Sequence, residues 1–407
     1  MSEYFLGRQP IYDASLNVTA YELLYRDDDG ANSAILDGDH ATSNVLTNSF
    51  LDMGLSRVVG DHQAYINFTR SFLLNHDDLP PPSQRLVLEI LENIDIDQKL
   101  IDSIAQLRRR GYIIALDDFV YNEDMLPLVE LANIIKIDLR ALSRDEVSRN
   151  LEILRKYPVK LLAEKIETPD EFDWCKSQGF HLFQGFFLCR PRILRGQRLP
   201  DNRVNAMRLI AKLQDPSVDV KDLEVLVAGD PTMSHRLLQY INSAAFSLRK
   251  KIGSIRHAII YVGIREIKQW ANMVALSTID DKPSELMVTC LVRARMCELF
   301  ADALGKDNKD YKGMAFVIGM FSLLDAMMDM PLESLLESMP LADEITDALL
   351  KGTGPYAVIL NNTLAYERGN WEAIDCPQLS ESAIADLYLQ ALEWANNTVK
   401  TLHAKDS

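Results

Sequence analysis

The sequence predicts an α/β chain, in which a TIM-like (β/α) barrel is followed by an all-α domain. Short β-branched or aliphatic runs alternate repeatedly with amphipathic helical patterns over the first half, the signature of a parallel sheet. Strand signals nearly vanish beyond residue 203. A chain of 407 residues is also too long for one ordinary core, so two or three domains are expected.

The predicted strands are apolar runs of the first half. They are 18–26, 64–68, 85–90, 112–118, 133–139, 159–164 and 180–186, and "FLGRQPIYD" at 5–13 supplies an eighth. Eight strands within about 190 residues favour a compact parallel barrel, and a doubly wound parallel sheet is the alternative.

Helical patterns lie between these strands. In 97–111 the apolar residues follow a spacing of three to four, and Gly111 supplies a stop. In 143–157, Ser143 is the expected N-cap, and Glu146 stands at the capping-box spacing.

A segment with two prolines and a glycine, 190–203, predicts the domain boundary, with a barrel over 1–195 and a helical domain over 196–407. Asp230 is expected as an N-cap before Pro231. The predicted helices of the second half are 204–214, 220–229, 233–246, 255–263, 265–277, 287–305, 313–328 and 380–403.

Composition limits the classes of function. A net charge of −16 argues against binding of a nucleic-acid polymer through a broad basic surface. No apolar run is long enough to span a bilayer, and the first residues do not resemble a signal peptide, so a cytoplasmic location without membrane association is expected. The five cysteines include no CxxC pair, which argues against a thiolate metal site.

Polar side chains recur at the ends of the predicted strands. They are Glu22 with Arg26, Asn67, Glu89, Asp117 with Asp118, Lys136 with Asp138, Glu164 and Gln184. Each alone has an ordinary structural explanation, such as a solvated strand end or a turn. Because the carboxyl ends of parallel barrel strands meet on one face, we expect the set to converge there.

The residue types indicate the chemistry. Carboxylates with one amide oxygen suit Mg²⁺ or Mn²⁺, and two such ions bridged by an aspartate can promote in-line attack on phosphorus. A lysine beside a carboxylate can orient the attacking water and take its proton. Arg26 offers a fork for a phosphate or a guanine edge. The residues therefore predict metal-assisted phosphodiester hydrolysis.

The same positions resemble the motifs of the EAL-type cyclic di-GMP phosphodiesterase domain over about residues 1–195. The matching stretches are "ELL" at 22–24 with Arg26, "INFT" around Asn67, "EILE" at 89–92, "DDFV" at 117–120, "KID" at 136–138, "AEKIET" at 163–168 and "QGF" at 184–186.

The resemblance implies roles for individual residues. Metal would be bound by Glu22, Asn67, Glu89, Asp117 and Asp118. Lys136 and Glu164 would activate water, and Arg26 and Gln184 would contact the dinucleotide. The surrounding loops would be supported by Glu92, Asp138 and Glu167.

The chain departs from the family pattern at several positions. Leu23 replaces an alanine, and Leu91 replaces a threonine. Lys165 replaces a glycine, and as the strand neighbour of Glu164 it should point to the opposite face. Val120 also replaces a glycine, before an unusual "YNEDM", and a β-branched residue does not readily adopt the positive φ that glycine permits. In the family, this loop helps to hold the metal site and the dimer contact.

The second half resembles the HDOD domain, a helical relative of HD phosphohydrolases, most clearly over 230–263. No histidine lies between His257 and His403, so the metal ligands of an HD hydrolase are missing. His235 and His257 are expected in surface or capping roles. The resemblance implies a regulatory or protein-interaction domain that is not an enzyme.

Two functions remain open for the whole chain. The first is a metal-dependent phosphodiesterase that converts cyclic di-GMP to pGpG, with a protein partner bound through the HDOD domain and a homodimer as the assembly. The second is a catalytically degenerate EAL domain that serves as a cyclic di-GMP sensor or an interaction scaffold. A metal-dependent sugar or acid enzyme on a generic barrel is a third hypothesis.

Overall fold

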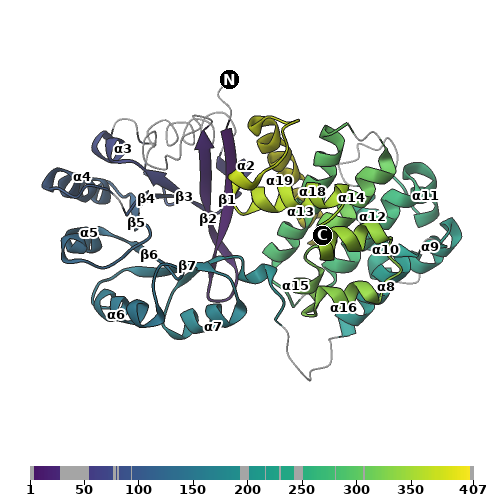
Figure 1. The fold of residues 1–407 in the computed structure, drawn as a ribbon, viewed down its shortest axis with the longest axis horizontal. Helices are drawn as coiled ribbons and strands as arrows, with labels where there is room; N and C mark the ends of the chain where they lie inside the picture. Colours follow the sequence, from purple (N-terminus) through teal and green to yellow (C-terminus); the bar gives the residue numbers. More distant parts are fainter. Residues whose placement is uncertain are drawn as a thin grey trace. The chain divides into compact units, whose positions relative to one another are not determined.

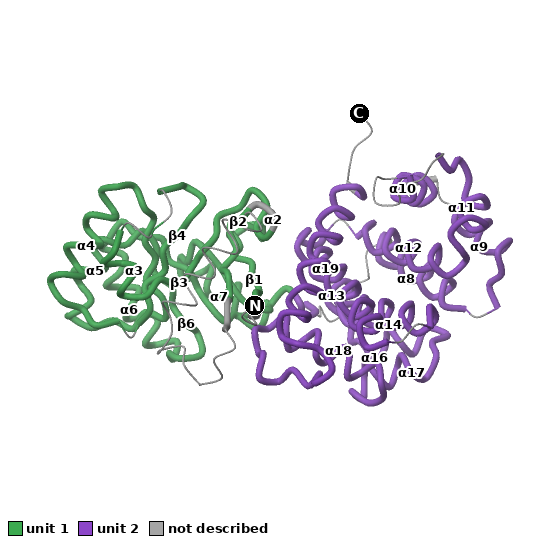
Figure 2. The backbone as a smooth tube through the Cα atoms, turned by 90° about the horizontal axis from the view of Figure 1, so that it is seen from above, with its two compact units in different colours: residues 1–188 green, residues 189–407 purple. Residues whose placement is uncertain are grey.

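The computed structural model describes most of the chain. The described residues are 4–27, 55–76, 79, 82–92, 94–192, 201–215, 217–228, 231–242, 251–279, 281–305 and 308–403. They form two compact units, Met1–Leu188 and Cys189–Ser407, which Figure 2 distinguishes by colour. The boundary expected at 195/196 stays a prediction, because 193–200 lie outside the described residues.

Within the described residues of the first unit, the strands close into a barrel in sequence order, which confirms the predicted fold class. The strands are β1 (Tyr4–Asp13), β2 (Val18–Asp27), β3 (Gln63–Phe68), β4 (Leu86–Ile90), β5 (Ile113–Leu116), β6 (Ile134–Asp138), β7 (Lys160–Ile166) and β8 (Leu182–Gly185). Each neighbouring pair from β2 to β8 is parallel.

The expectation of an all-parallel barrel is wrong for β1, which runs antiparallel to both β2 and β8. A tight turn joins β1 to β2, where the Asp13 carboxylate accepts the backbone N–H groups of Ser15 at 2.8 Å and Asn17 at 2.9 Å. So short a connection can form a hairpin but has no room for a crossover helix.

Helices α3 to α7 lie around the outside of the strands (Figure 1). The helices of this unit are α2 (Leu55–Val59), α3 (Arg70–Leu74), α4 (Gln98–Arg109), η3 (Glu123–Met125), α5 (Leu126–Leu131), α6 (Arg144–Leu154) and α7 (Pro169–Ser177), with η4 (Phe187–Cys189) at the end. Asp97 caps α4, and the predicted capping box of Ser143 and Glu146 on α6 is confirmed.

One apolar layer fills the middle of the barrel, with one side chain from every strand. Its members are Ile11, Ala20, Tyr65, Val87, Ala115, Ile134, Leu162 and Leu182. Burying a large apolar side chain stabilises a fold by about 1.5–3 kcal/mol. This layer therefore fixes which face of each strand points inward, and with it the direction of every residue two positions along.

The described residues of the second unit are helical, as predicted. The helices are α8 (Asp201–Gln214), α9 (Val220–Ala228), α10 (Pro231–Ile241), α11 (Ile255–Val262), α12 (Ile264–Ser277), α13 (Ser284–Ala303), α14 (Lys309–Phe321), α15 (Leu324–Met328), α16 (Leu332–Glu337), α17 (Asp343–Thr346), the π-helix η6 (Asp347–Lys351), α18 (Pro355–Glu367), the short η7 (Trp371–Ala373) and α19 (Glu381–His403).

Several predictions for this unit can be compared with the structure residue by residue. Pro231 is the first residue of α10, while its expected cap, Asp230, lies outside the described residues. His235 and His257 are both exposed. Helix α18 was not predicted, because it buries side chains around most of its circumference and so lacks an amphipathic period.

Helices α13 and α14 pack closely at Gly319. A Cβ at this position would lie 2.7 Å from the backbone oxygen of Arg293 and 2.8 Å from the Cα of Ala294, so only glycine allows this approach. None of the helices in the described residues combines the length and the apolar character that a membrane-spanning helix needs.

Candidate active site at the mouth of the barrel

The predicted site residues follow the apolar layer by two positions on their strands. They are Glu22 after Ala20, Asn67 after Tyr65, Glu89 after Val87, Asp117 after Ala115, Lys136 after Ile134, Glu164 after Leu162 and Gln184 after Leu182. Residues two apart on a strand share a face, so these polar groups form the next inward layer.

Lys136 lies at the centre of this polar layer and is fully buried. Its Nζ is 2.7 Å from Glu89 Oε1, 2.7 Å from Asp117 Oδ1, 2.9 Å from Glu164 Oε1 and 3.5 Å from Glu22 Oε2. Four carboxylates, three on β2, β4 and β7 and one directly after β5, therefore surround one ammonium group.

Burial and mutual attraction act against each other on these groups. Burial alone would lower the pKa of Lys136, but Glu164, Glu22, Glu89 and Asp117 outweigh it and raise that pKa well above its usual value. Burial raises the pKa of Glu164 to about 8 and that of Glu89 well above its usual range, although Lys136 opposes both shifts. Because four carboxylates surround a single ammonium group, the site would bind a further cation favourably.

Hydrogen bonds of Gln184 link the antiparallel strand β1 to the site. Its Nε2 donates to Glu22 Oε2 at 2.6 Å and to Gln9 Oε1 at 2.9 Å. Gln9 was not predicted as a site residue. Because β1 runs antiparallel, Gln9 precedes its layer residue Ile11 by two positions instead of following it, and only the strand direction reveals this.

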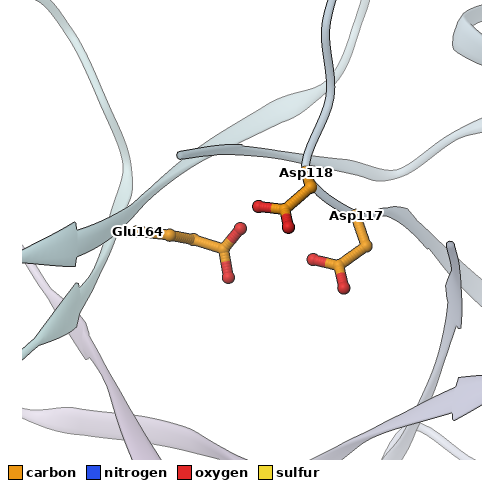
Figure 3. Close-up of side chains that lie close together, drawn as sticks. All are labelled: Asp117, Asp118 and Glu164. Carbon is orange, nitrogen blue, oxygen red and sulfur yellow. The ribbon is translucent and has the colours of Figure 1, made fainter. Parts of the chain in front are cut away.

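The remaining oxygen donors lie at the same mouth. Asn67 on β3 is paired in register with Glu89 on β4. Oxygens of Asp117, Asp118 and Glu164 lie within 4.8 Å of one another, and Figure 3 shows their carboxylates turned toward one another. The donor set is made of carboxylate and amide oxygens, which fits a hard divalent cation such as Mg²⁺ or Mn²⁺.

The loop after Asp118 differs from the expectation of strain at Val120. Among the described residues Val120 does not have a positive φ, and the residue is 53% exposed. The positive φ, 41°, falls on Asp118 instead, and Asn122 caps η3 by accepting the N–H of Met125 at 3.0 Å. Aspartate tolerates this backbone region better than a β-branched residue does.

The prediction that Lys165 points away from Glu164 is wrong. Strand β7 has one extra residue between Ala163 and Ile166 relative to β8, a β-bulge, and Lys165 takes φ 55° there. Its Nζ lies 2.6 Å from Asp138 Oδ2 and 3.6 Å from Asp118 Oδ1. The bulge breaks the alternation on which the prediction depended.

The bulge also explains Gly185. A Cβ on Gly185 would lie 2.1 Å from the backbone oxygen of Ile166, so the bulged strand can approach β8 only at a glycine. Gln184, which reaches Glu22, depends on this close approach for its position.

The expected supporting residues lie around the mouth. Asp138 is buried and accepts the backbone N–H of Arg140 at 2.6 Å. Glu167 is exposed and 3.8 Å from Arg140 Nε, and Glu92 is exposed. Arg26 belongs to the backbone of β2, but its side chain lies outside the described residues.

The shifted pKa of Glu164 predicts a pH-dependent stability. Because the folded-state pKa of about 8 lies above the ordinary value of 4.5, the folded protein holds a proton that the unfolded chain releases between these values. In EDTA, the free energy of unfolding should therefore fall as pH rises from 5 to 8, by at most about 1.4 kcal/mol per pH unit for this group. Urea unfolding of wild type and Glu164→Gln measures this, and equal pH slopes for the two proteins would contradict it.

Comparison with known proteins adds domain-level matches. The family model described as EAL domain matches residues 56–191, and the model described as HDOD domain matches residues 199–333.

Two curated proteins match nearly the whole chain. The uncharacterized protein YuxH of Bacillus subtilis is 33% identical over 404 residues, which are 97% of this chain and 98% of YuxH. The cyclic di-GMP phosphodiesterase CdgJ of Vibrio cholerae is 34% identical over 378 residues, 91% of this chain and 86% of CdgJ. A solved structure of the PaMucR phosphodiesterase with c-di-GMP aligns with 46% of this chain and 96% of its own, at 25% identity and a TM-score of 0.38.

Proposed function

The chain belongs to the family of proteins in which an EAL domain is followed by an HDOD domain, and on this basis we propose that it is a cyclic di-GMP phosphodiesterase that forms pGpG. In this proposal the EAL domain spans 1–195 and the HDOD domain spans 196–407. The relative CdgJ, similar over both domains, is named for that activity.

The observation that carries the proposal is the convergence of Glu22, Glu89, Asp117 and Glu164 on Lys136. Such a group is expensive to bury, because each charge loses its water. The apolar layer already fills the core of the barrel, so the stability of the fold does not require this charged group. An oxygen-lined acidic mouth suits a reaction on an anionic phosphodiester only with divalent cations, which reverse the local field.

The metal-binding residues of the proposal are Glu22, Asn67, Glu89, Asp117 and Asp118, holding two Mg²⁺ or Mn²⁺ ions. Bound there, the ions would supply Lewis-acid activation of the phosphodiester and of the attacking water.

The other roles fall to side chains of the chain itself. With the cations bound, whose charge would favour the ionised form of Glu164, this carboxylate accepts the proton of the water. Lys136, 2.9 Å from Glu164 Oε1, holds that carboxylate in place. Water adds across one P–O bond, which opens the ring to the linear dinucleotide. Gln184 and Arg26 contact the dinucleotide, while Glu92, Asp138 and Glu167 support the loops.

For the helical unit we propose a protein-binding role. Three apolar side chains support it by their exposure: Val225 on α9 is 67% exposed, and Ile260 and Tyr261 on α11 are 73% and 63% exposed. Helices α9 and α11 pack against each other. Large apolar residues left exposed on neighbouring helices are more typical of interaction surfaces than of a solvated helix face. A homodimer and a cytoplasmic location stay predictions.

A second function, binding of cyclic di-GMP without turnover, is favoured by one observation. The ammonium group of Lys165 lies beside Asp118 in the acidic mouth, where it adds a positive charge to the proposed metal site.

Turnover tests the proposal directly. Purified full chain is incubated with cyclic di-GMP and Mn²⁺ or Mg²⁺, and pGpG is followed by chromatography. We expect wild type to form pGpG and Glu22→Ala to be slower by about 100-fold or more, since a lost metal ligand removes several kcal/mol of transition-state stabilisation.

Glu152→Ala, which removes an exposed carboxylate on α6, is the matched control and should keep wild-type activity. If wild type forms pGpG no faster than Glu22→Ala, the phosphodiesterase proposal fails. Binding of cyclic di-GMP measured on the same samples then decides between a sensor and a scaffold.

A further inference from the structure

Lys165 occupies an unusual backbone position at the mouth of the barrel. It lies in the β7 bulge between Ala163 and Ile166, with φ 55°, a conformation that L side chains rarely adopt. Regular alternation would have turned this residue to the outside of the barrel, away from Glu164. The bulge instead gives a long cationic side chain access to the same end as the acidic layer.

The contacts of Lys165 are acidic on both sides. Its ammonium group lies 2.6 Å from Asp138 Oδ2 and 3.6 Å from Asp118 Oδ1. Asp118 in turn belongs to the oxygen cluster with Asp117 and Glu164. The side chain of Lys165 is 52% exposed, so it can leave Asp118 without losing a buried environment.

A divalent cation bound by Asp118 and a lysine ammonium beside Asp118 repel each other and share one carboxylate. The other ammonium of the site, that of Lys136, lies against Asp117 on the inner side of the cluster, where Glu89 and Glu164 also contact it. Asp118 is the more exposed of the two aspartates, at 37% against 12% for Asp117, and it is the one that lies beside Lys165.

We propose that Lys165 is an internal cation that competes for Asp118, so that the site binds one divalent cation tightly and a second one weakly. The inference rests on the proposed metal site and adds to it a difference in affinity between the two cations, which this residue causes. The chain therefore needs a higher metal concentration to fill the site than the oxygen donors alone would require.

The test counts Mn²⁺ bound to the full chain, from the electron paramagnetic resonance signal of free Mn²⁺ during a titration. We expect wild type to show one tight and one weak site. In Lys165→Met and Lys165→Gly the second site should bind about tenfold tighter, the effect of one like charge a few ångströms away in a solvated site. Lys165→Arg, which keeps the charge, should match wild type.

The two uncharged variants guard against a folding artefact, because methionine keeps the backbone strain and glycine relieves it. Asp117→Asn separates the possible failures. If Asp117→Asn binds Mn²⁺ as wild type does, the proposed metal site itself is wrong. If Asp117→Asn loses binding but both uncharged variants bind the second Mn²⁺ as weakly as wild type, the metal site stands and the role of Lys165 is overturned.

Discussion

Replacing Lys136 by methionine is expected to lower the free energy of unfolding of the metal-free protein by about 3–5 kcal/mol, the usual cost of removing one partner of a buried ion pair. The ammonium group is the central positive charge among Glu22, Glu89, Asp117 and Glu164, all within 3.5 Å. Without it, carboxylates face one another in a water-poor layer. Urea unfolding in EDTA measures the loss.

Millimolar Mn²⁺ should restore much of this stability, because a cation bound by the same oxygens stabilises only the folded state. Lys160→Met is the matched control: Lys160 lies exposed at the opposite end of β7, and its loss should change stability by about 0.5 kcal/mol or less. Equal stabilities of the Lys136 and Lys160 variants would show that the carboxylate layer does not depend on the ammonium group.

In the helical unit, Arg293→Met is expected to be similarly costly, about 3–5 kcal/mol. Arg293 on α13 is buried, and it donates from Nε to Glu367 Oε2 at 2.9 Å, from Nη2 to Glu367 Oε1 at 2.7 Å, and from Nη1 to Ser322 Oγ at 2.8 Å. The substitution leaves the carboxylate of Glu367, 16% exposed, without its cation. Tryptophan fluorescence follows the unfolding well, since Trp270, Trp371 and Trp394 all lie in this unit.

Arg295→Met is the control on the same helix. The ion pair of Arg295 with Glu298 is partly exposed, so its loss should cost about 1 kcal/mol or less. The double variant Arg293→Met with Glu367→Leu should recover part of the stability, because it removes both charges together. If Arg293→Met unfolds with the same midpoint as Arg295→Met, the buried pair contributes little to the unit.

Much of the fold could be predicted because local patterns record which face of an element is buried. The capping box at Ser143 and the period-two strands depend only on neighbours in sequence. Helix α18 could not be predicted, since a helix buried around most of its circumference has no polar face to reveal its period.

The same distinction holds for the candidate site. By itself the sequence determined which polar side chains follow the apolar layer on β2 to β8, since residues two apart share a face of a strand. Only the tertiary structure revealed the two exceptions to this rule, the antiparallel direction of β1 and the bulge in β7. The hairpin between β1 and β2 brings Gln9 to Gln184, and the bulge in β7 turns Lys165 toward Asp118. Strand direction and register depend on pairing between distant segments, which no local pattern records.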